Sequence, residues 1–238
     1  MTQRYYSATP IAAERVVLAD AEAHHLAHVM RASVNDEVTL FDGSGAEFAA
    51  RIVRIAKHSV ELEITERREV DRELPFTLTL AVALPKGDRQ KWLVEKVVEL
   101  GVTRIVPLVT ARSVADGAAA LERLRRGVIE ASKQCGRNRL MEISAPRKWS
   151  EFAAEPCAVS SVRLFAHLAT APNNPSPCGA SNASQQIAIA IGPEGGWTDE
   201  EAAFAQSNDW RFVDLGPRIM RVETAAIALA SIVSQERQ

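Results

Sequence analysis

The spacing of apolar residues changes near residue 73 and divides the chain into two parts. In the first part, residues 36–55 read as two strands joined by the turn Asp42–Gly45, and Ser59–Glu66 alternates cleanly between apolar and polar positions. A short helix is predicted over Asp20–Arg31, with its first residue as N-cap. These elements predict a small β-barrel-like domain over residues 1–72.

A charged stretch without apolar periodicity, Glu66–Leu74, is expected to be a linker, and from Phe76 onward strand and helix patterns alternate. The predicted strands lie over 76–84, 104–109, 162–168, 187–192 and 210–216, and the predicted helices over 88–101, 119–137, 197–207 and 223–235. We expect Asp88 to cap the first of these helices, and Ala169–Gln186, rich in Pro, Ser and Asn, to be a surface loop. This alternation predicts an α/β domain over residues 73–238, built on a mostly parallel sheet that binds ligands at the C-terminal ends of its strands.

Composition places the chain among ordinary globular proteins: 47% of its 238 residues are hydrophobic and 24% are charged. No apolar run approaches the roughly 18 residues of a membrane span, and the N-terminal residues lack an apolar export segment. Cys135, Cys157 and Cys178 lie far apart without a metal-binding or CxxC spacing, so we expect reduced thiols and a cytoplasmic protein. His24 and His28 have helical spacing, but no cysteine or carboxylate completes a ligand set, and we expect no metal.

Charge is distributed unevenly. Residues 76–150 hold 14 Lys and Arg against 7 Asp and Glu, whereas residues 1–75 hold 9 against 13 and residues 151–238 hold 5 against 10. A local basic excess favours a surface that meets a polyanion such as nucleic acid, although solvated helices also collect Lys and Arg.

A glycine-rich turn, Gly192–Gly196, follows an apolar strand and precedes an acidic helix start. Thr198 and Glu201 have the spacing of a capping box, with Trp197 just before the cap. Helix N-termini favour anions, but Glu194 and the acidic residues after Thr198 oppose a phosphate here, and neither a GxGxxG nor a GxxxxGK[ST] pattern is present. The turn is better suited to a cationic ligand, or to one held by backbone groups.

A second turn, Gly216–Pro217, also ends a predicted strand, and Arg218 and Arg221 follow it before the last helix. The two turns are expected to form one pocket. The alternative is a tightly turned α/β sheet without a ligand.

Taken together, "IGPEGGWTDEE" and "LGPRIMRVETAAIAL" resemble the paired motifs of the ribosomal RNA small subunit methyltransferase E family. The resemblance extends over nearly the whole chain, through "RYY", "HHLAHVMRASVNDEVTLFDGSG", "ALPKGDRQKWLVEKVVELGVTRIVPLVTARS" and "EASKQCGR". Met220 and Val222 depart from the residues expected at their positions, and the loop over 169–186 is long and irregular.

The family resemblance implies a PUA-like N-terminal β-barrel and a C-terminal SPOUT α/β domain with a trefoil knot. It implies an enzyme that uses S-adenosylmethionine to methylate N3 of a specific uridine of 16S rRNA in the small ribosomal subunit. It further implies a homodimer, with the apolar helix Ala225–Val233 partly at the interface. The alternatives are a SPOUT enzyme that acts on tRNA or a ribose hydroxyl, and a non-catalytic RNA-binding homologue.

Under this resemblance, Arg221 is the first candidate to stabilise a uracil oxygen or anchor a flipped nucleotide. Glu194 and Glu223 are candidate proton acceptors, although Glu223 also suits the N-terminus of its helix, so the general base stays open. His167 is a weaker candidate for the same role, because histidines at strand ends are commonly structural.

Two larger sets complete the expected site. The cofactor-binding candidates are Phe165, Ala166, His167, Ile191, Gly192, Pro193, Glu194, Gly195, Gly196, Leu215, Gly216, Ile219, Met220, Arg221, Thr224 and Ala225. The RNA-binding candidates are Arg4, Arg31, Lys86, Arg112, Arg125, Arg126, Arg137 and Arg139, with Arg123 and Lys133 on the same basic helix; some of these are expected to be plain solvated charges.

Overall fold

The computed structural model describes residues 3–113, 118–156, 161–167 and 186–235. Within them the chain forms two compact units. Unit 1 contains Met1–Glu73 together with Ser132–Leu140, and unit 2 contains Leu74–Ala131 and Met141–Gln238. Cys157, Cys178 and most of the predicted surface loop lie outside the described residues.

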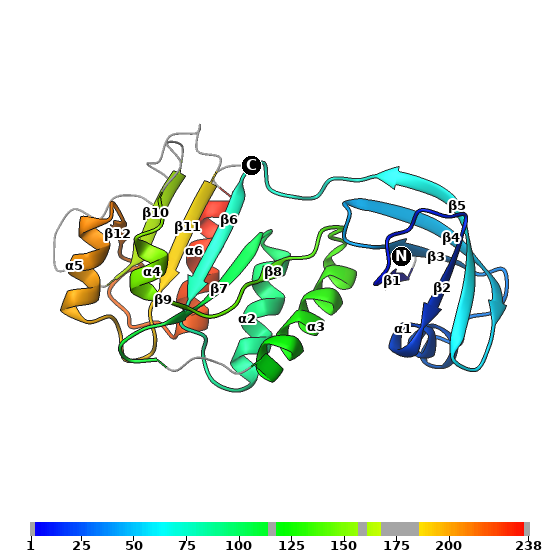
Figure 1. The fold of residues 1–238 in the computed structure, drawn as a ribbon, viewed down its shortest axis with the longest axis horizontal. Coiled ribbons are helices and arrows are strands. Elements are labelled where there is room, and N and C mark those ends of the chain that lie inside the picture. Colours follow the sequence, from blue (N-terminus) through cyan, green and yellow to red (C-terminus); the bar gives the residue numbers. More distant parts are fainter. Residues whose placement is uncertain (1–2, 114–117, 157–160, 168–185, 236–238) are drawn as a thin grey trace. The chain divides into compact units, whose positions relative to one another are not determined.

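Unit 1 is built on a curled five-stranded sheet in the order β1-β3-β4-β5-β2 (Figure 1). Its strands are β1 (Arg4–Tyr6), β2 (Arg15–Ala19), β3 (Glu37–Phe41), β4 (Ala46–Ile55) and β5 (Ser59–Glu69). The register between β4 and β5 shifts at Ala49/Ala50 and again at Ile52/Arg54, and such irregularities bend a sheet. The curl encloses the fully buried side chains of Leu40 and Leu62, so the barrel-like fold expected for this part is confirmed as a half-barrel.

Three predictions for this unit were wrong in detail. The expected single helix is an α-helix, α1 (Asp20–His24), that continues as a π-helix over His25–Val29. Ala19 occupies the N-cap position, while Asp20 is the first helical residue and has a φ of 49°. The expected linker also begins later than predicted, because Glu66–Glu69 continue β5 and pair with β4.

Unit 2 contains a seven-stranded sheet whose recorded strand pairings are all parallel, as predicted. Six strands follow the order β12-β10-β11-β6-β7-β8, and β9 pairs with β7. The strands are β6 (Thr77–Val82), β7 (Arg104–Val109), β8 (Glu142–Ile143), β9 (Arg147–Lys148), β10 (Ser161–Ala166), β11 (Gln186–Ile191) and β12 (Arg211–Val213).

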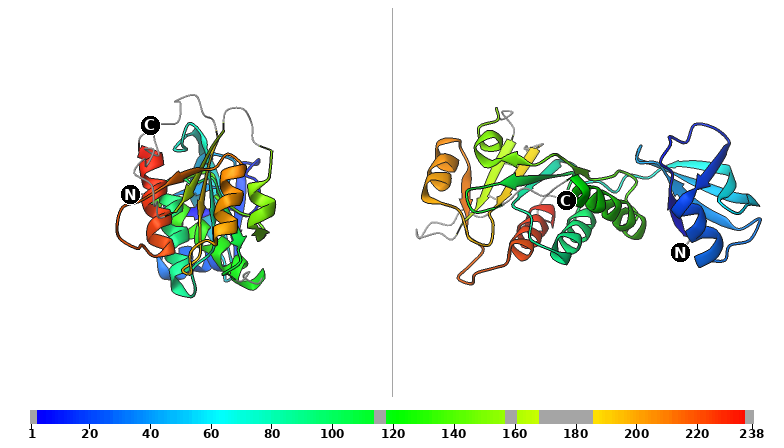
Figure 2. Two further views of the ribbon diagram at one scale, coloured as in Figure 1. Left: turned by 90° about the vertical axis from the view of Figure 1, so that its left-hand side faces the viewer. Right: turned by 60° about the horizontal axis from the view of Figure 1, so that its bottom comes forward.

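Helices cover both faces of this sheet, which explains why β11 is a nearly continuous apolar run (Figure 2). The helices are α2 (Asp88–Glu99), α3 (Ala118–Cys135), α4 (Trp149–Ala153), α5 (Asp199–Ser207) and α6 (Val222–Gln235). α2 and α6 pack against each other, with α6 also against β6 and β11, while α4 packs against α5. Gly87, with a φ of 68°, occupies the N-cap position of α2, so the prediction that Asp88 caps this helix was wrong.

Candidate active site

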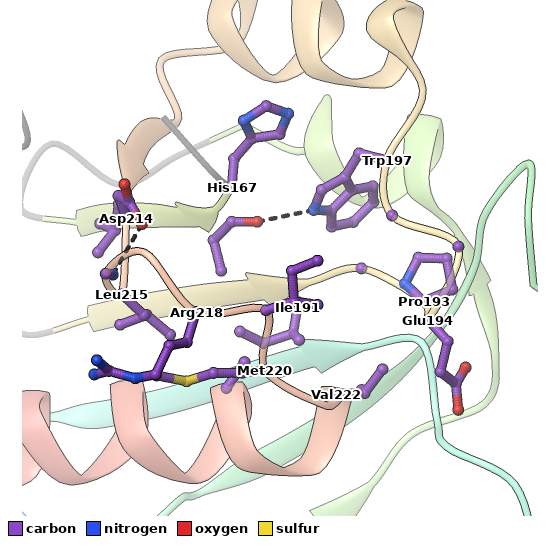
Figure 3. Close-up of a pocket in the computed structure, with 18 residues that line it drawn as sticks. His167, Ile191, Pro193, Glu194, Trp197, Asp214, Leu215, Arg218, Met220 and Val222 are labelled. Atoms are coloured by element: carbon purple, nitrogen blue, oxygen red, sulfur yellow. Dashed lines mark hydrogen bonds between the residues drawn. The ribbon is translucent and has the colours of Figure 1, made fainter. Parts of the chain in front are cut away.

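A pocket of about 420 Å³ lies at the C-terminal ends of β10, β11 and β12 in unit 2 (Figure 3). This volume is within the range of small-molecule sites, and the position is the one that parallel sheets use for ligands. Both glycine turns contribute to its lining, so the expectation that they form one pocket is confirmed. The predicted cofactor-binding residues that line it are Ala166, His167, Ile191, Gly192, Pro193, Glu194, Gly195, Gly196, Leu215, Gly216, Ile219, Met220 and Ala225.

Three predicted residues lie outside this lining, each for a visible reason. The Phe165 side chain is fully buried on a face of the sheet where it packs with Trp149 and Trp197. Arg221 and Thr224, on either side of the start of α6, are exposed, while the intervening Val222 lines the pocket.

The lining also contains residues that the sequence did not single out for the cofactor. These are Trp197, Val213, Asp214, Arg218 and Val222. Val213 ends the observed strand β12 and Asp214 follows it, both inside the predicted strand over 210–216; their place just before the second glycine turn is the signal that would have found them. Trp197 was interpreted only as a residue next to a helix cap.

Trp197 explains the first glycine of the glycine-rich turn. Its indole Nε1 donates a 3.0 Å hydrogen bond to the carbonyl oxygen of Ala166 at the end of β10. A Cβ at Gly192 would lie 2.8 Å from the Trp197 ring, closer than real contacts allow. The absence of a side chain at Gly192 therefore lets the ring join two neighbouring strand ends.

The rest of this turn is fixed by backbone and cap interactions. The Gly196 amide donates to the Pro193 carbonyl at 2.8 Å, and Gly196 has a φ of 71°, which a side chain would strain. Thr198 and Glu201 form the predicted capping box at the start of α5. Glu201 also accepts a 2.8 Å hydrogen bond from the Ala111 amide in the loop after β7.

Arg112, from that same loop, supports the turn directly. Its Nη1 donates to the Gly195 carbonyl at 2.6 Å and lies 3.4 Å from the Trp197 carbonyl. The residue was predicted to bind RNA phosphate. In the structure Arg112 is exposed, but its guanidinium contacts the glycine turn. This contact joins segments that are distant in sequence, so no local sequence pattern predicts it.

The second turn is held by its own aspartate. Asp214 accepts a 2.9 Å hydrogen bond from the Gly216 amide, and Gly216 has a φ of 103°. Ile219, which follows on the same loop, is 89% exposed although it lines the pocket. The pocket therefore has an apolar residue at its open edge.

The two predicted carboxylates differ in environment. Glu194 lines the pocket and is exposed, whereas Glu223 in the first turn of α6 is 4% exposed. Arg89 of α2 lies between them: its Nη2 is 3.3 Å from Glu194 Oε1, and its Nη1 is 3.7 Å from Glu223 Oε2. Arg89 was not predicted as a site residue, because only the packing of α2 on α6 brings it to these two carboxylates.

His167 and Arg221 have different surroundings. The His167 amide bonds to the Val213 carbonyl at 3.0 Å, and its ring packs against Phe165 and Phe212. These contacts are what a structural histidine at a strand end makes. Arg221 is exposed just before α6 and does not belong to the pocket lining.

The lining has the chemistry that S-adenosylmethionine requires. Ile191, Leu215, Met220 and Ala225 provide apolar surface for an adenine and a methionine chain, and the glycine turns expose backbone donors and acceptors. Glu194 and Asp214 are compatible with a sulfonium cation, whereas they would oppose a phosphate.

The other basic candidates fall into two groups. Arg31, Lys86, Arg123, Arg126 and Arg139 are exposed. Arg125 is also exposed, but it pairs with Glu122 at 3.4 Å and donates to the Ile143 carbonyl at 3.1 Å.

The second group is engaged inside unit 1. Arg137 is 4% exposed and donates two hydrogen bonds to the carboxylate of Glu73. Arg4 bonds to Glu47 at 2.9 Å and to Asn138 Oδ1 at 2.6 Å. A phosphate would have to displace these contacts, so both arginines have a structural role in unit 1. Lys133 likewise pairs with Glu22 at 2.8 Å.

The ionic group around Glu47 joins distant parts of unit 1. Arg72 reaches Glu47 at 3.1 Å and the Gly136 carbonyl at 3.0 Å. Burial by itself raises the pKa of the Glu47 carboxyl, but hydrogen bonds from Arg4 and Arg72 outweigh it and hold this pKa below its ordinary value.

The described residues contain neither a metal-binding group nor a membrane-spanning helix. The His24 and His28 rings lie 5.0 Å apart, but the described side chains contain no group of three His, Cys, Asp or Glu arranged to hold a metal ion. Among the described helices, none combines the length and the apolar character needed to cross a membrane.

Comparison with known proteins assigns the chain to a class of protein. Residues 72–234 match the RNA methyltransferase domain family, and residues 18–65 match the RNA methyltransferase PUA domain family. The chain therefore belongs to the RNA methyltransferases that carry a PUA-like domain before the α/β domain.

Curated relatives narrow this class. The chain is 36% identical over 223 residues to ribosomal RNA small subunit methyltransferase E of Synechocystis, covering 91% of this chain and 72% of that protein. It is 30% identical to the Bacillus subtilis protein of the same name, covering 91% and 88%. The chain belongs to the ribosomal RNA small subunit methyltransferase E family.

Solved structures agree over nearly the full length. The Neisseria gonorrhoeae ribosomal RNA small subunit methyltransferase E, bound to S-adenosyl methionine, superposes with a TM-score of 0.90 at 31% identity, covering 99% of this chain and 98% of that one. A Legionella pneumophila methyltransferase in complex with the same cofactor gives 0.85 at 32% identity, with the same coverage.

Proposed function

We propose that this protein uses S-adenosylmethionine to methylate N3 of a specific uridine in the 16S rRNA of the small ribosomal subunit. The observation that carries the proposal is the pocket built from the two glycine turns. Its apolar walls, exposed backbone groups and acidic side chains suit this cofactor, and the two similar structures above are bound to it. The small-subunit RNA follows from the family, and the uridine N3 position follows from the sequence resemblance.

The cofactor supplies an electrophilic methyl group when it is bound. The chain must therefore position the uracil and accept the N3 proton. Arg221 is exposed beside the pocket, where its guanidinium can stabilise the charge that develops on a uracil carbonyl oxygen. Glu194 lines the pocket, so of the two carboxylates it is the one placed to accept a proton, while the buried Glu223 supports the wall.

The exposed arginines and lysines of the basic segment are the proposed RNA contacts. Arg123 and Arg126 lie on α3, and Lys86 lies just before α2. Such contacts to phosphate provide affinity without reading sequence. Selection of one uridine then requires the base to leave its stack and enter the site.

We also propose that the protein is a homodimer, that the C-terminal domain contains a trefoil knot, and that it works in the cytoplasm, where ribosomal subunits are assembled. The family resemblance supports the knot and the dimer. The exposed side chain of Ile219 at the open edge of the pocket supports a partner surface there.

The test compares small-subunit RNA from a strain lacking the gene with RNA from the same strain carrying wild-type or Arg221→Ala protein. Nucleoside mass spectrometry should find 3-methyluridine only with the wild-type protein. A methylated ribose, or a methylated nucleoside in tRNA alone, would overturn the assignment of the target atom or of the RNA.

A further inference from the structure

The start of α2 meets both walls of the pocket. β6 and β11 are neighbours in the sheet, and the Ala83 amide just after β6 donates to the Ile191 carbonyl at the end of β11 at 3.0 Å. α2 then packs along α6. A long side chain in the first turn of α2 can therefore reach the glycine turn after β11 and the first turn of α6 together.

Arg89 makes this double contact. Its two terminal nitrogens lie 3.3 Å from Glu194 Oε1 and 3.7 Å from Glu223 Oε2. Glu194 belongs to the pocket lining, and Val222 and Ala225 on either side of Glu223 also belong to it. Arg89 itself is not among the described lining residues, so any effect on the ligand passes through these two glutamates.

Burial makes the Glu223 contact more than a surface ion pair. The Glu223 side chain is 6% exposed, and its Oε2 has no hydrogen-bond partner among the described residues. A buried carboxylate is unfavourable unless a cation or donors compensate it, and Arg89 supplies that compensation. The Lys96–Glu99 pair on the same helix, where both side chains are 32% exposed, contains no buried carboxylate and contributes little by comparison.

We propose that Arg89 is a positioning residue that fastens the glycine turn to the start of α6 and so sets the width of the cofactor pocket. The guanidinium is suited to this because it is planar and can address two carboxylates at once, which an ammonium on a flexible chain does poorly. The identity of the cofactor in this proposal rests on the proposed function. The contact of Arg89 with the glycine turn and with the start of α6 is independent of that function.

The experiment measures binding of S-adenosylmethionine to the full chain by calorimetry for wild type, Arg89→Gln, Arg89→Lys and the control Lys96→Gln. Arg89→Gln is expected to weaken binding about tenfold, which corresponds to a coupling of ordinary size for contacting charged residues. Arg89→Lys should recover part of the loss, and Lys96→Gln should bind like wild type. Equal affinity of Arg89→Gln and wild type would overturn the proposal.

Neutralising each glutamate in the Arg89→Gln background distinguishes a positioning role of Arg89 from general destabilisation of the protein. Glu223→Gln should restore part of the lost affinity, because the uncompensated buried charge is then removed, whereas Glu194→Gln at its exposed position should not. A merely destabilised protein would be weakened further by both changes, and that result would also overturn the proposal. If Arg89→Gln folds poorly, as judged by circular dichroism, Arg89→Lys and the Glu223→Gln double variant carry the same comparison.

The outcomes also separate this inference from the proposed function. A wild-type protein that binds the cofactor but leaves small-subunit RNA unmethylated contradicts the proposed reaction while the Arg89 comparison still stands. A methylating enzyme whose affinity is insensitive to Arg89→Gln contradicts the positioning role alone.

Discussion

The indole of Trp197 is hydrogen-bonded to the backbone of Ala166 and stacked on Phe165, with ring centroids 4.6 Å apart. Through this one side chain, the turn after β11 is attached to the end of the neighbouring strand β10. A residue that lines the pocket is therefore held in place by two kinds of contact, a hydrogen bond and ring stacking.

Replacing Trp197 by Phe should keep part of the stacking and remove the hydrogen bond. We expect a loss of about 1 kcal/mol in the free energy of unfolding, the usual worth of a neutral hydrogen bond, together with weaker cofactor binding. Urea denaturation and calorimetry measure the two effects. Trp92→Phe is the matched control, because Trp92 on α2 is 46% exposed, and it should change neither quantity.

Gly192→Ala should be more damaging than its size suggests. The new Cβ would meet the Trp197 ring at 2.8 Å, so the ring must move and lose its bond to Ala166. We expect a loss of about 1–3 kcal/mol from overpacking and a corresponding fall in cofactor affinity.

The matched control for this change is Gly127→Ala on α3. A Cβ there would make an ordinary 3.9 Å contact with Val94, and alanine favours a helix over glycine by roughly 0.5–1 kcal/mol. Thermal unfolding should therefore show a slight gain for Gly127→Ala. Equal stability of the Gly192→Ala protein and wild type would show that the Trp197 ring is not fixed in the turn.

Reversing the charge of Arg123 and Arg126 should weaken RNA binding and flatten its dependence on salt. Each phosphate contact that is lost removes about 0.7–0.9 from the slope of log K against log salt. Filter binding at several salt concentrations measures this slope. Cofactor affinity should not change, and reversal of Arg211, an exposed residue on β12, should leave the slope unaltered. An unchanged slope for the double variant would assign this face of α3 to solvent.

Glu47→Gln should remove a pH-dependent part of the stability of unit 1. The pKa of Glu47 is lower in the folded protein than its ordinary value, so the ionised carboxylate stabilises the fold at pH values above that ordinary value. This contribution is lost as the pH falls through the folded pKa. Urea denaturation should therefore find the variant less stable at pH 7, with the difference from wild type shrinking as the pH falls through the folded pKa.

The exposed Arg51–Glu63 pair provides the comparison for Glu47. These side chains are 47% and 37% exposed, and such pairs add little to stability. Glu63→Gln should therefore differ from wild type by less than Glu47→Gln does at neutral pH. A larger effect of Glu63→Gln would contradict the assignment of the stabilisation to the buried ionic group.

Features that depend on residues close together in the sequence could be predicted from the sequence alone. The capping box at Thr198 and the parallel sheet were predicted from local spacing, and the two glycine turns were placed correctly at strand ends. The sequence-based prediction agreed least with the structure where the backbone geometry departs from common helix patterns. The π-helix after α1 and the positive φ of Asp20 have no signature in apolar periodicity.

Contacts between side chains and segments that are distant in sequence also could not be predicted from local sequence patterns. Arg89, Arg112 and Arg137 all lie in stretches with an excess of positive charge, and only the fold shows what each one contacts. Arg112 and Arg137 were assigned to RNA on charge alone. Both contact the protein itself, because a guanidinium bonds to a nearby carbonyl or carboxylate as readily as to a phosphate.

Unit 1 is discontinuous in sequence, and this has a consequence for its synthesis. When residue 73 leaves the ribosome, Ser132–Leu140 do not yet exist, so Arg4 lacks Asn138, Arg72 lacks the Gly136 carbonyl and Glu73 lacks Arg137. At roughly 5–20 residues per second, the missing segment follows after several seconds. During this interval the nascent N-terminal sheet lacks the ion pair and hydrogen bonds that Ser132–Leu140 provide. The domain that emerges first from the ribosome is thus finished only after a large part of the second has been translated.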